Sequence, residues 1–257
     1  MNAASAMLQA GCGRGSIGVA ILLALALASF PGSAQADGDQ RRVAQVTHLS
    51  GALVAKHADG SVKYLSVAAD VNEGDLLATQ EGAYARLKFA DGAEVVLRPS
   101  SRLSVVSYRF AENAPDRDSV ELRLLKGGMR AVTGTIARRS GDRVKVVVSG
   151  TTIGMRNAHF GTLLCRGDCG AIRMPGNVPP KDGMHLDVAA GEVTVRNAAG
   201  PQSVKAGQFA YAPPDAGAPP AIVPPGQGIQ VTMPLAIARN AAPVAGGATS
   251  EQGCPTQ

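Results

Sequence analysis

Short segments of alternating apolar and polar residues, each followed by a glycine turn, constrain this chain more than any other feature. In 83–89 the apolar side chains fall at every second position, and Asp91-Gly92 follows two residues later. Side chains alternate between the two faces of a strand, so this period of two predicts a half-buried β-strand. Asp-Gly is a strong hairpin signal. The same period recurs at 94–98, 119–125, 144–148 and 193–195.

The sequence predicts an all-β fold. No segment of ten or more residues beyond the N-terminal apolar run shows the 3.6-residue period of an amphipathic helix. We expect antiparallel short strands in a sandwich or in a β-roll with solenoid character. A weak internal repeat supports this, since 51–60 and 191–200 each read as a strand followed by a glycine turn. Two copies are too few to establish a true solenoid.

The first 36 residues have the layout of an export leader. An apolar run over 17–30 is followed by Pro31 and then by Ala34-Gln35-Ala36, a small-x-small cleavage site. At about 1.5 Å per residue the run spans roughly 21 Å, less than the roughly 30 Å hydrocarbon core of a bilayer. We expect cleavage after Ala36 and a periplasmic location. An uncleaved membrane anchor is the alternative.

Composition divides the rest of the chain. We expect a β domain over 37–165, and hairpins over 166–211 that continue the same domain. Residues 212–257 are rich in Pro, Ala and Gly and poor in large apolar residues. We therefore expect a flexible tail there, with 229–235 as a candidate edge strand.

The spacing of the cysteines allows two interpretations. Cys165 and Cys169 flank three residues that suit a turn, and in an oxidising compartment we expect a disulfide between them. A metal site shared with His159 and His185 is the alternative, although C-x₃-C is not the usual zinc spacing. We predict no metal and no cofactor. Cys254 is left over in the tail, either free or available for pairing between chains.

Catalytic motifs are missing from the sequence. It contains no H-E-x-x-H, no G-x-S-x-G and no G-x-x-x-x-G-K-[ST]. Two carboxylates lie next to glycines, and we expect them to have structural roles in turns, because Asp side chains form hydrogen bonds with the turn backbone. The residues of these turns are Gly74, Asp75, Asp91 and Gly92. For His48 and His57 we expect solvated or capping roles. We therefore predict that the protein is not an enzyme; an enzyme using His159, His185 and the cysteines is the rival reading.

Five segments from 73 to 160 follow one another in a defined order. They are E-G-D-L-L-A-T at 73–79, G-A-Y-A-R-L-K-F-A-D-G-A at 82–93, L-R-P-S-S at 97–101, L-K-G-G-M-R at 125–130 and V-V-V-S-G-T-T-I-G-M-R-N-A-H-F at 146–160. This order resembles the FecR-type periplasmic domain. Its pattern runs from G-D-x-[IL]-x-T through F-x-D-G-S and L-x-P-x-S to a closing I-x-x-R-G-T-[DE]-F, and the resemblance covers roughly 46 to 165.

The resemblance implies a periplasmic module that reads the signalling domain of an outer-membrane receptor. FecR-type regulators also carry a cytoplasmic anti-sigma segment and a transmembrane helix. Only 16 residues precede the apolar run here, so we expect no sigma-factor binding. Asn157-Ala158-His159 stands where the family has Gly-Thr and an acidic residue. Asn tolerates the positive φ that the glycine allows, but a role that needs a carboxylate at 159 is in doubt.

These expectations converge on a binding function. We expect an exported, non-enzymatic sensor or interaction module that contacts another envelope protein, with no nucleic acid and with the membrane only nearby. The candidate surface is 153–164, with Arg156, Asn157, His159 and Phe160 as binding residues. A plain core strand and turn is the alternative for this segment. The rival function is a structural or cell-wall glycan-associated protein that binds through its basic face. Oligomeric state is not predicted.

Overall fold

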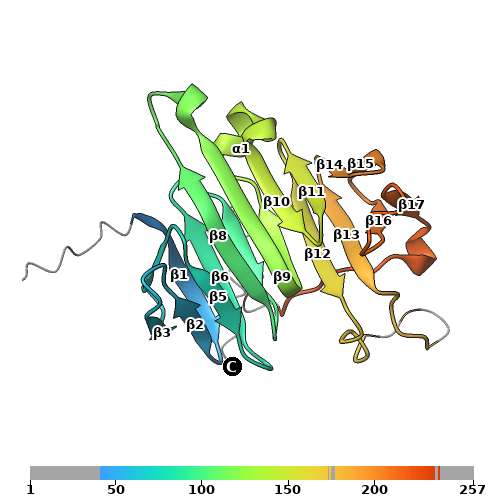
Figure 1. The fold of residues 1–257 in the computed structure, drawn as a ribbon, viewed down its shortest axis with the longest axis horizontal. Helices are drawn as coiled ribbons and strands as arrows, with labels where there is room; N and C mark the ends of the chain where they lie inside the picture. The colour runs from blue at the N-terminus through green and yellow to red at the C-terminus, as the bar shows by residue number, and fades with distance from the viewer. Residues whose placement is uncertain (1–40, 173, 175–176, 235–236, 238–257) are drawn as a thin grey trace, which may run out of the picture. The chain divides into compact units, whose positions relative to one another are not determined.

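The strands form one mixed sheet that folds into two layers. The computed structural model describes residues 41–172, 174, 177–234 and 237 (Figure 1). The expected leader at 1–36 and Cys254 lie outside these residues. Within the described ranges, no helix is long and apolar enough to cross a membrane.

Both layers share one long strand, β9 (Ser119–Val132). Sheet A contains, in spatial order, β4 (Asp70–Asn72), β1 (Arg42–Ser50), β6 (Tyr84–Phe89), β7 (Glu94–Leu97), the second half of β9, β12 (His159–Cys165), β13 (Gly183–Ala190), β16 (Phe209–Ala212) and β17 (Ala221–Val223). Sheet B contains β3 (Val62–Leu65), β2 (Leu53–Lys56), β5 (Leu76–Thr79), β8 (Arg102–Arg109), the first half of β9, β10 (Val144–Val148), β11 (Thr151–Met155), β14 (Glu192–Asn197) and β15 (Gly200–Lys205).

Hairpins alternate between the two sheets along the chain. β2–β3, β10–β11 and β14–β15 belong to sheet B, whereas β6–β7, β12–β13 and β16–β17 belong to sheet A. The strand content confirms the all-β prediction. The two copies of the weak repeat form the β2–β3 and β14–β15 hairpins, which lie at opposite ends of sheet B.

One pair of strands departs from the antiparallel expectation. β10 runs parallel to β9, because the connection at 133–143 carries the chain from sheet A back to the same end of sheet B. That connection contains α1 (Thr135–Arg139) and the 3₁₀ turn η2 (Gly141–Arg143). Two other short 3₁₀ turns, Pro115–Arg117 and Pro225–Gln227, lie in connections. The sequence did not predict α1, because five residues are too few to show a helical period.

Alternating apolar side chains fill the space between the sheets. Leu87 and Phe89 of sheet A face Leu122 and Leu124 of sheet B in one core, and all four are nearly or fully buried. The other face of β6 was expected to be polar and open. Arg86 is instead 1% exposed, and its Nη2 lies 2.7 Å from Glu94 Oε2. Part of the outer face of sheet A is therefore covered as well.

Residues 212–234 do not form the flexible tail that the sequence predicts. β17 pairs with β16, and Ile229 and Val231 then pack against Leu163 and the cysteine pair in a second apolar cluster. No strand forms at 229–234, so the candidate edge strand is wrong for this part. These alternate apolar residues bury enough surface to hold a proline-rich segment in place. Most of the remainder, 235–236 and 238–257, lies outside the described residues.

β9 changes sheets at Gly127 and Gly128. Lys126 still pairs with β8, whereas Gly127 and Gly128 pair with β12. The buried Ser101 hydroxyl lies 2.9 Å from both the amide and the carbonyl of Gly128. Gly127 has φ +73°, and a Cβ added there would lie 2.4 Å from Ser101 Oγ. Only glycine fits this bend without displacing Ser101.

We predict that Gly127→Ala destabilises the protein more than Gly150→Ala. Gly150 has φ +77° with nothing within 4 Å of an added Cβ. The Gly150→Ala substitution should therefore cost only the strain of a left-handed backbone, about 1–2 kcal/mol. Gly127→Ala adds overpacking against Ser101, and we expect a total loss above about 2 kcal/mol. Urea unfolding of both variants measures the difference. Equal losses would show that the bend tolerates a side chain.

Candidate functional site

The candidate surface at 153–164 is split between the exterior and the core. Arg156 and Asn157 are exposed in the turn between β11 and β12, and His159 is half-buried. Phe160 is fully buried in the main core, so its proposed binding role is wrong: its ring cannot reach a partner. Asn157 also lacks the positive φ expected of a residue that replaces glycine.

Arg156 lines an open groove on the outer face of sheet B. The groove has a volume of about 840 Å³ and is bounded by β10, β11, β14 and η2. Across its floor, Gly154 pairs with Lys145 on one side and with Thr194 on the other. Because Gly154 has no side chain, the middle strand leaves a hollow between its neighbours. The lining residues are Gly141, Asp142, Val144, Lys145, Thr152, Gly154, Met155, Arg156, Glu192, Thr194 and Arg196.

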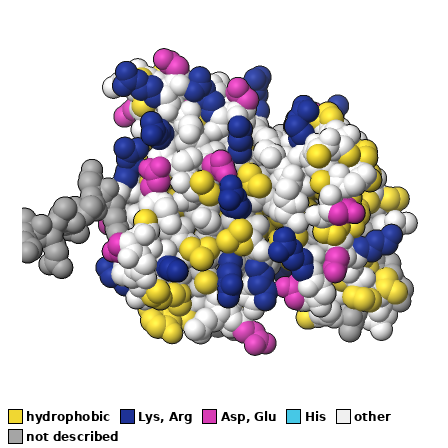
Figure 2. Space-filling model, in the orientation of Figure 1, with side chains coloured by type: hydrophobic (Ala, Val, Ile, Leu, Met, Phe, Trp, Pro, Cys, Tyr) yellow, Lys and Arg dark blue, Asp and Glu magenta, His cyan; other side chains and the backbone are white. Residues whose placement is uncertain are grey.

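The groove carries three exposed cations, on β10, on β14 and in the turn after β11. Within the described part of the chain, Lys145, Arg156 and Arg196 make no ion pair or side-chain hydrogen bond. Of the two carboxylates, Glu192 accepts a hydrogen bond from the Ser203 hydroxyl. Other Lys and Arg side chains are dispersed among Asp and Glu on the face shown in Figure 2. With its three cations and the two carboxylates of Asp142 and Glu192, the lining carries a formal charge of +1 in a concave setting.

A second polar cluster lies on the outer face of sheet A around Arg130. Arg130 on β9 and Asp187 on β13 flank Gly161 of β12 in the strand register. Across this glycine, Arg130 Nη1 lies 3.0 Å from Asp187 Oδ2. Arg130 Nε also donates to His159 Nε2 at 2.8 Å. His159 thus occupies the family's acidic position, while the carboxylate that pairs with Arg130 comes from β13.

Burial shifts the pKa values of the groups around Arg130. Desolvation lowers the pKa of His159 from its ordinary value, and the Arg130 charge lowers it further. Desolvation raises the pKa of Asp187, although the Val231 amide and Arg130 oppose that shift. The sequence analysis did not single out Arg130 or Asp187. Arg130 lay within a quoted family segment, but its partners are 29 and 57 residues away in the chain.

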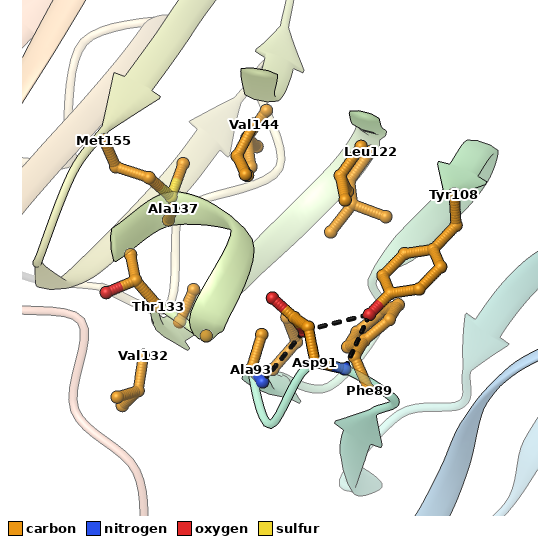
Figure 3. Close-up of a pocket in the computed structure, with 15 residues that line it drawn as sticks. Phe89, Asp91, Ala93, Tyr108, Leu122, Val132, Thr133, Ala137, Val144 and Met155 are labelled. Carbon is orange, nitrogen blue, oxygen red and sulfur yellow. Dashed lines mark hydrogen bonds between the residues drawn. The ribbon is translucent and has the colours of Figure 1, made fainter. Parts of the chain in front are cut away.

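Asp91 and Gly92 form the turn between β6 and β7, and Asp91 also anchors α1. Its Oδ1 accepts hydrogen bonds from the Ala93 amide at 3.1 Å and from the Tyr108 hydroxyl at 2.9 Å (Figure 3). Its Oδ2 accepts from the Ile136 amide at 3.2 Å. Desolvation and the Asp91 charge raise the pKa of Tyr108. The adjacent cavity of about 30 Å³ is mostly apolar and too small for an organic ligand.

Gly74 and Asp75 lie in the turn between β4 and β5. Asp75 Oδ2 accepts the Asn72 amide at 2.8 Å, as a turn carboxylate does. Its Oδ1 lies 2.7 Å from Nδ1 of His57, and both residues are buried. The expectation of a solvated or capping His57 is therefore wrong. The pairing joins residues 18 apart, and nothing in the local sequence indicates it.

Cys165 and Cys169 form the expected disulfide. Their sulfurs are therefore not available as thiolate ligands, which removes the metal site built on them. His185 is occupied elsewhere: its Nε2 lies 2.8 Å from the Lys181 carbonyl, and its ring packs against Tyr211. Among the described residues, no group of three His, Cys, Asp or Glu side chains is placed to hold a metal ion.

We predict that His159→Gln weakens the acid sensitivity of the protein. The folded pKa of His159 lies below 6.5, so the unfolded chain binds the proton more readily. The contribution of neutral His159 to the free energy of unfolding should be complete above pH 6.5. It should decrease as the pH drops toward the folded pKa. Gln still offers Arg130 an oxygen acceptor but does not titrate.

Urea unfolding at about pH 7.5 and about pH 5 tests this. The stability lost between the two pH values should be smaller in His159→Gln than in the unmodified protein. It should not vanish, because burial also lowers the pKa of His185. The exposed His48, changed to Gln, is the matched control. If His159→Gln loses as much stability between the two pH values as the unmodified protein, His159 does not cause the acid sensitivity.

Comparison with solved structures finds low similarity. Two crystal structures of a candidate anti-sigma factor from Parabacteroides distasonis ATCC 8503 are each 11% identical, with TM-scores of 0.41 and 0.42. Each covers 58% of this chain and 58% of that chain, so the chain spans less than two thirds of these relatives. A cell surface anchoring domain is 21% identical over 24% of this chain and 82% of that chain, with a TM-score of 0.24. No curated protein matches.

The family comparison is more specific. The family described as FecR protein matches residues 75–193. This range begins at β5, passes through β9 and ends at the start of β14. It contains the Asp91 turn, the bend at Gly127, and both Arg130 and Arg156. Over these residues, the FecR-type resemblance predicted from the sequence is confirmed.

Proposed function

We propose that this protein is an exported, non-enzymatic FecR-like sensor module that binds another protein of the cell envelope. The observation that carries the proposal is the open groove on sheet B, with its free cations Lys145, Arg156 and Arg196. The FecR match over 75–193 supports a signalling role. The Cys165–Cys169 disulfide supports an oxidising compartment such as the periplasm.

The chemistry of the groove favours binding over catalysis. Its lining contains no His, Cys or Ser side chain, and the Glu192 carboxylate accepts a hydrogen bond from the Ser203 hydroxyl rather than contacting a nucleophile of the lining. Its floor consists of paired strands that carry Lys145 and Arg196, and Arg156 lies in the turn that follows β11. A rigid, charged surface of this kind favours electrostatic complementarity with a partner.

The charge of the groove indicates the partner's chemistry. Two guanidinium groups, on Arg156 and Arg196, can each bind a carboxylate with two parallel hydrogen bonds. Thr152 and Thr194 add hydroxyl groups between them. We therefore propose that the partner presents an acidic protein surface. Nucleic acid is not part of the proposal, and the membrane is involved only by proximity.

The export proposal has a direct test. If the leader is removed after Ala36, the first residue of the protein recovered from the periplasmic fraction is Asp37. N-terminal sequencing of that fraction reads this residue. Recovery of the protein only from the membrane fraction with 1–36 retained would support the anchor reading instead.

We predict that charge reversal in the groove weakens partner binding. Arg156→Glu and Arg196→Glu should each reduce complex formation by about tenfold or more, as loss of one close charge pair does. Lys63→Glu on the edge strand β3 is the matched control, because Lys63 is exposed and outside the groove. All three variants are expected to keep the unfolding transition of the original protein.

The measurement uses a photo-crosslinking residue at Asn157, beside the groove, in the native envelope, with mass spectrometry to identify the product. A single envelope protein whose crosslinking falls in the two groove variants and not in Lys63→Glu supports the proposal. Purified sacculi provide the contrast. Saturable, salt-sensitive retention on sacculi without a protein product would favour the glycan-associated function instead.

A further inference from the structure

A short C-terminal segment lies across the outer face of sheet A. We call residues 228–233 the strap, and Arg130, Gly161, Leu163 and Asp187 the cradle. Ile229 and Val231 are buried in an apolar cluster with Leu163, Cys165 and Cys169. Met233 packs against this cluster and is partly exposed. Gln230 and Thr232 between them are exposed. The strap therefore presents every second side chain to the cradle, as an extended peptide does.

The cradle binds the backbone of one strap residue through side chains. Arg130 Nη1 donates to the Val231 carbonyl at 2.7 Å. The Val231 amide donates to Asp187 Oδ1 at 2.9 Å. Both polar groups of one peptide residue are thus satisfied without strand pairing. Because these contacts use backbone atoms, they would hold the backbone of any extended segment other than one with proline at this position.

Gly161 provides a socket for the side chain at that residue. A Cβ added at Gly161 would lie 2.5 Å from Val231 Cβ and 2.4 Å from Asp187 Oδ1. Val231 is 0% exposed. Leu163 and the Cys165–Cys169 pair give apolar contacts beside it. The socket therefore selects a small apolar side chain, with further apolar residues two positions away on either side.

Few contacts fasten the strap to the rest of the domain. Within residues 228–234 the only backbone groups bound to a strand of sheet A are those of Val231. The preceding residues 213–225 contain six prolines, which lack the amide donor needed for pairing, and pair with sheet A only through the three residues of β17. A segment with so few hydrogen bonds opens at much lower free energy than the sheet beneath it.

We propose that the cradle is a binding site for an extended peptide and that the strap is its displaceable internal ligand. The external ligand is a segment of a partner protein with small or medium apolar residues at alternate positions and polar residues between them. The pattern of the strap, Ile-x-Val-x-Met, defines this chemistry. Binding of the partner segment exchanges one occupant for another, with Arg130 and Asp187 holding the new backbone. This site is separate from the groove on sheet B.

The test uses the full chain and a fluorescent peptide with the strap sequence 227–234, Q-G-I-Q-V-T-M-P. Val231→Asp places a carboxylate beside Asp187 and should release the strap. We expect this variant to bind the peptide at least about tenfold more tightly than the original protein, because the strap no longer competes. Fluorescence anisotropy measures both affinities.

Three controls separate exchange from general loosening. Thr232→Asp adds the same charge at an exposed position and should bind like the original protein. A peptide with Asp at its valine should not bind the released variant. Adding Gly161→Ala to Val231→Asp fills the socket and should abolish binding. Equal peptide binding by the original protein and Val231→Asp, or no binding by either, would overturn the proposal.

A milder variant covers the case in which Val231→Asp does not fold. Val231→Thr keeps the shape of the side chain but puts a hydroxyl into the apolar socket. It should raise peptide affinity by a smaller factor while keeping the original unfolding transition. Unchanged affinity in a folded Val231→Thr would count against displacement. Loss of groove-dependent crosslinking has no bearing on these results, so the two proposals fail separately.

Discussion

The bend in β9 is the constraint on which both layers depend. Its first half pairs with β8 and β10, and its second half pairs with β7 and β12. Gly127 and Gly128 allow the strand to turn out of one sheet into the other, and Ser101 fixes the turn by bonding both polar groups of Gly128. Since each half supplies buried side chains to the same core, the register of β9 positions both outer faces.

Glycine in a middle strand creates space on each outer face. On sheet B, Gly154 lies between Lys145 and Thr194 and opens the groove. On sheet A, Gly161 lies between Arg130 and Asp187 and lets those two side chains meet over it. The two places differ in occupancy, because the strap fills the second and no described residue fills the first. A glycine in a middle strand thus produces one site that is occupied by the strap and one that is open.

These features are the basis of the proposed binding function. Two of the three groove cations lie on paired strands and the third, Arg156, lies in the turn after β11. The hydrogen-bonded carboxylates Asp75 and Asp91 contact turns and neighbouring elements. The FecR match over 75–193 agrees with a signalling module. In the proposed function, the groove accepts an acidic partner. In the separate proposal for sheet A, the cradle binds a segment with apolar residues at alternate positions.

Local features could be read from the residues alone: alternating strands, the Asp91-Gly92 hairpin, the cysteine pair and the family pattern. Each depends on residues within a few positions of one another, where side-chain period and turn chemistry act directly. Which residues share a site depends on the packing of the folded chain. Burial of Phe160, the His57–Asp75 pair and the Arg130–Asp187 cradle each depend on how distant strands come side by side. The period of a strand sets which face a side chain takes, but only packing sets what covers that face.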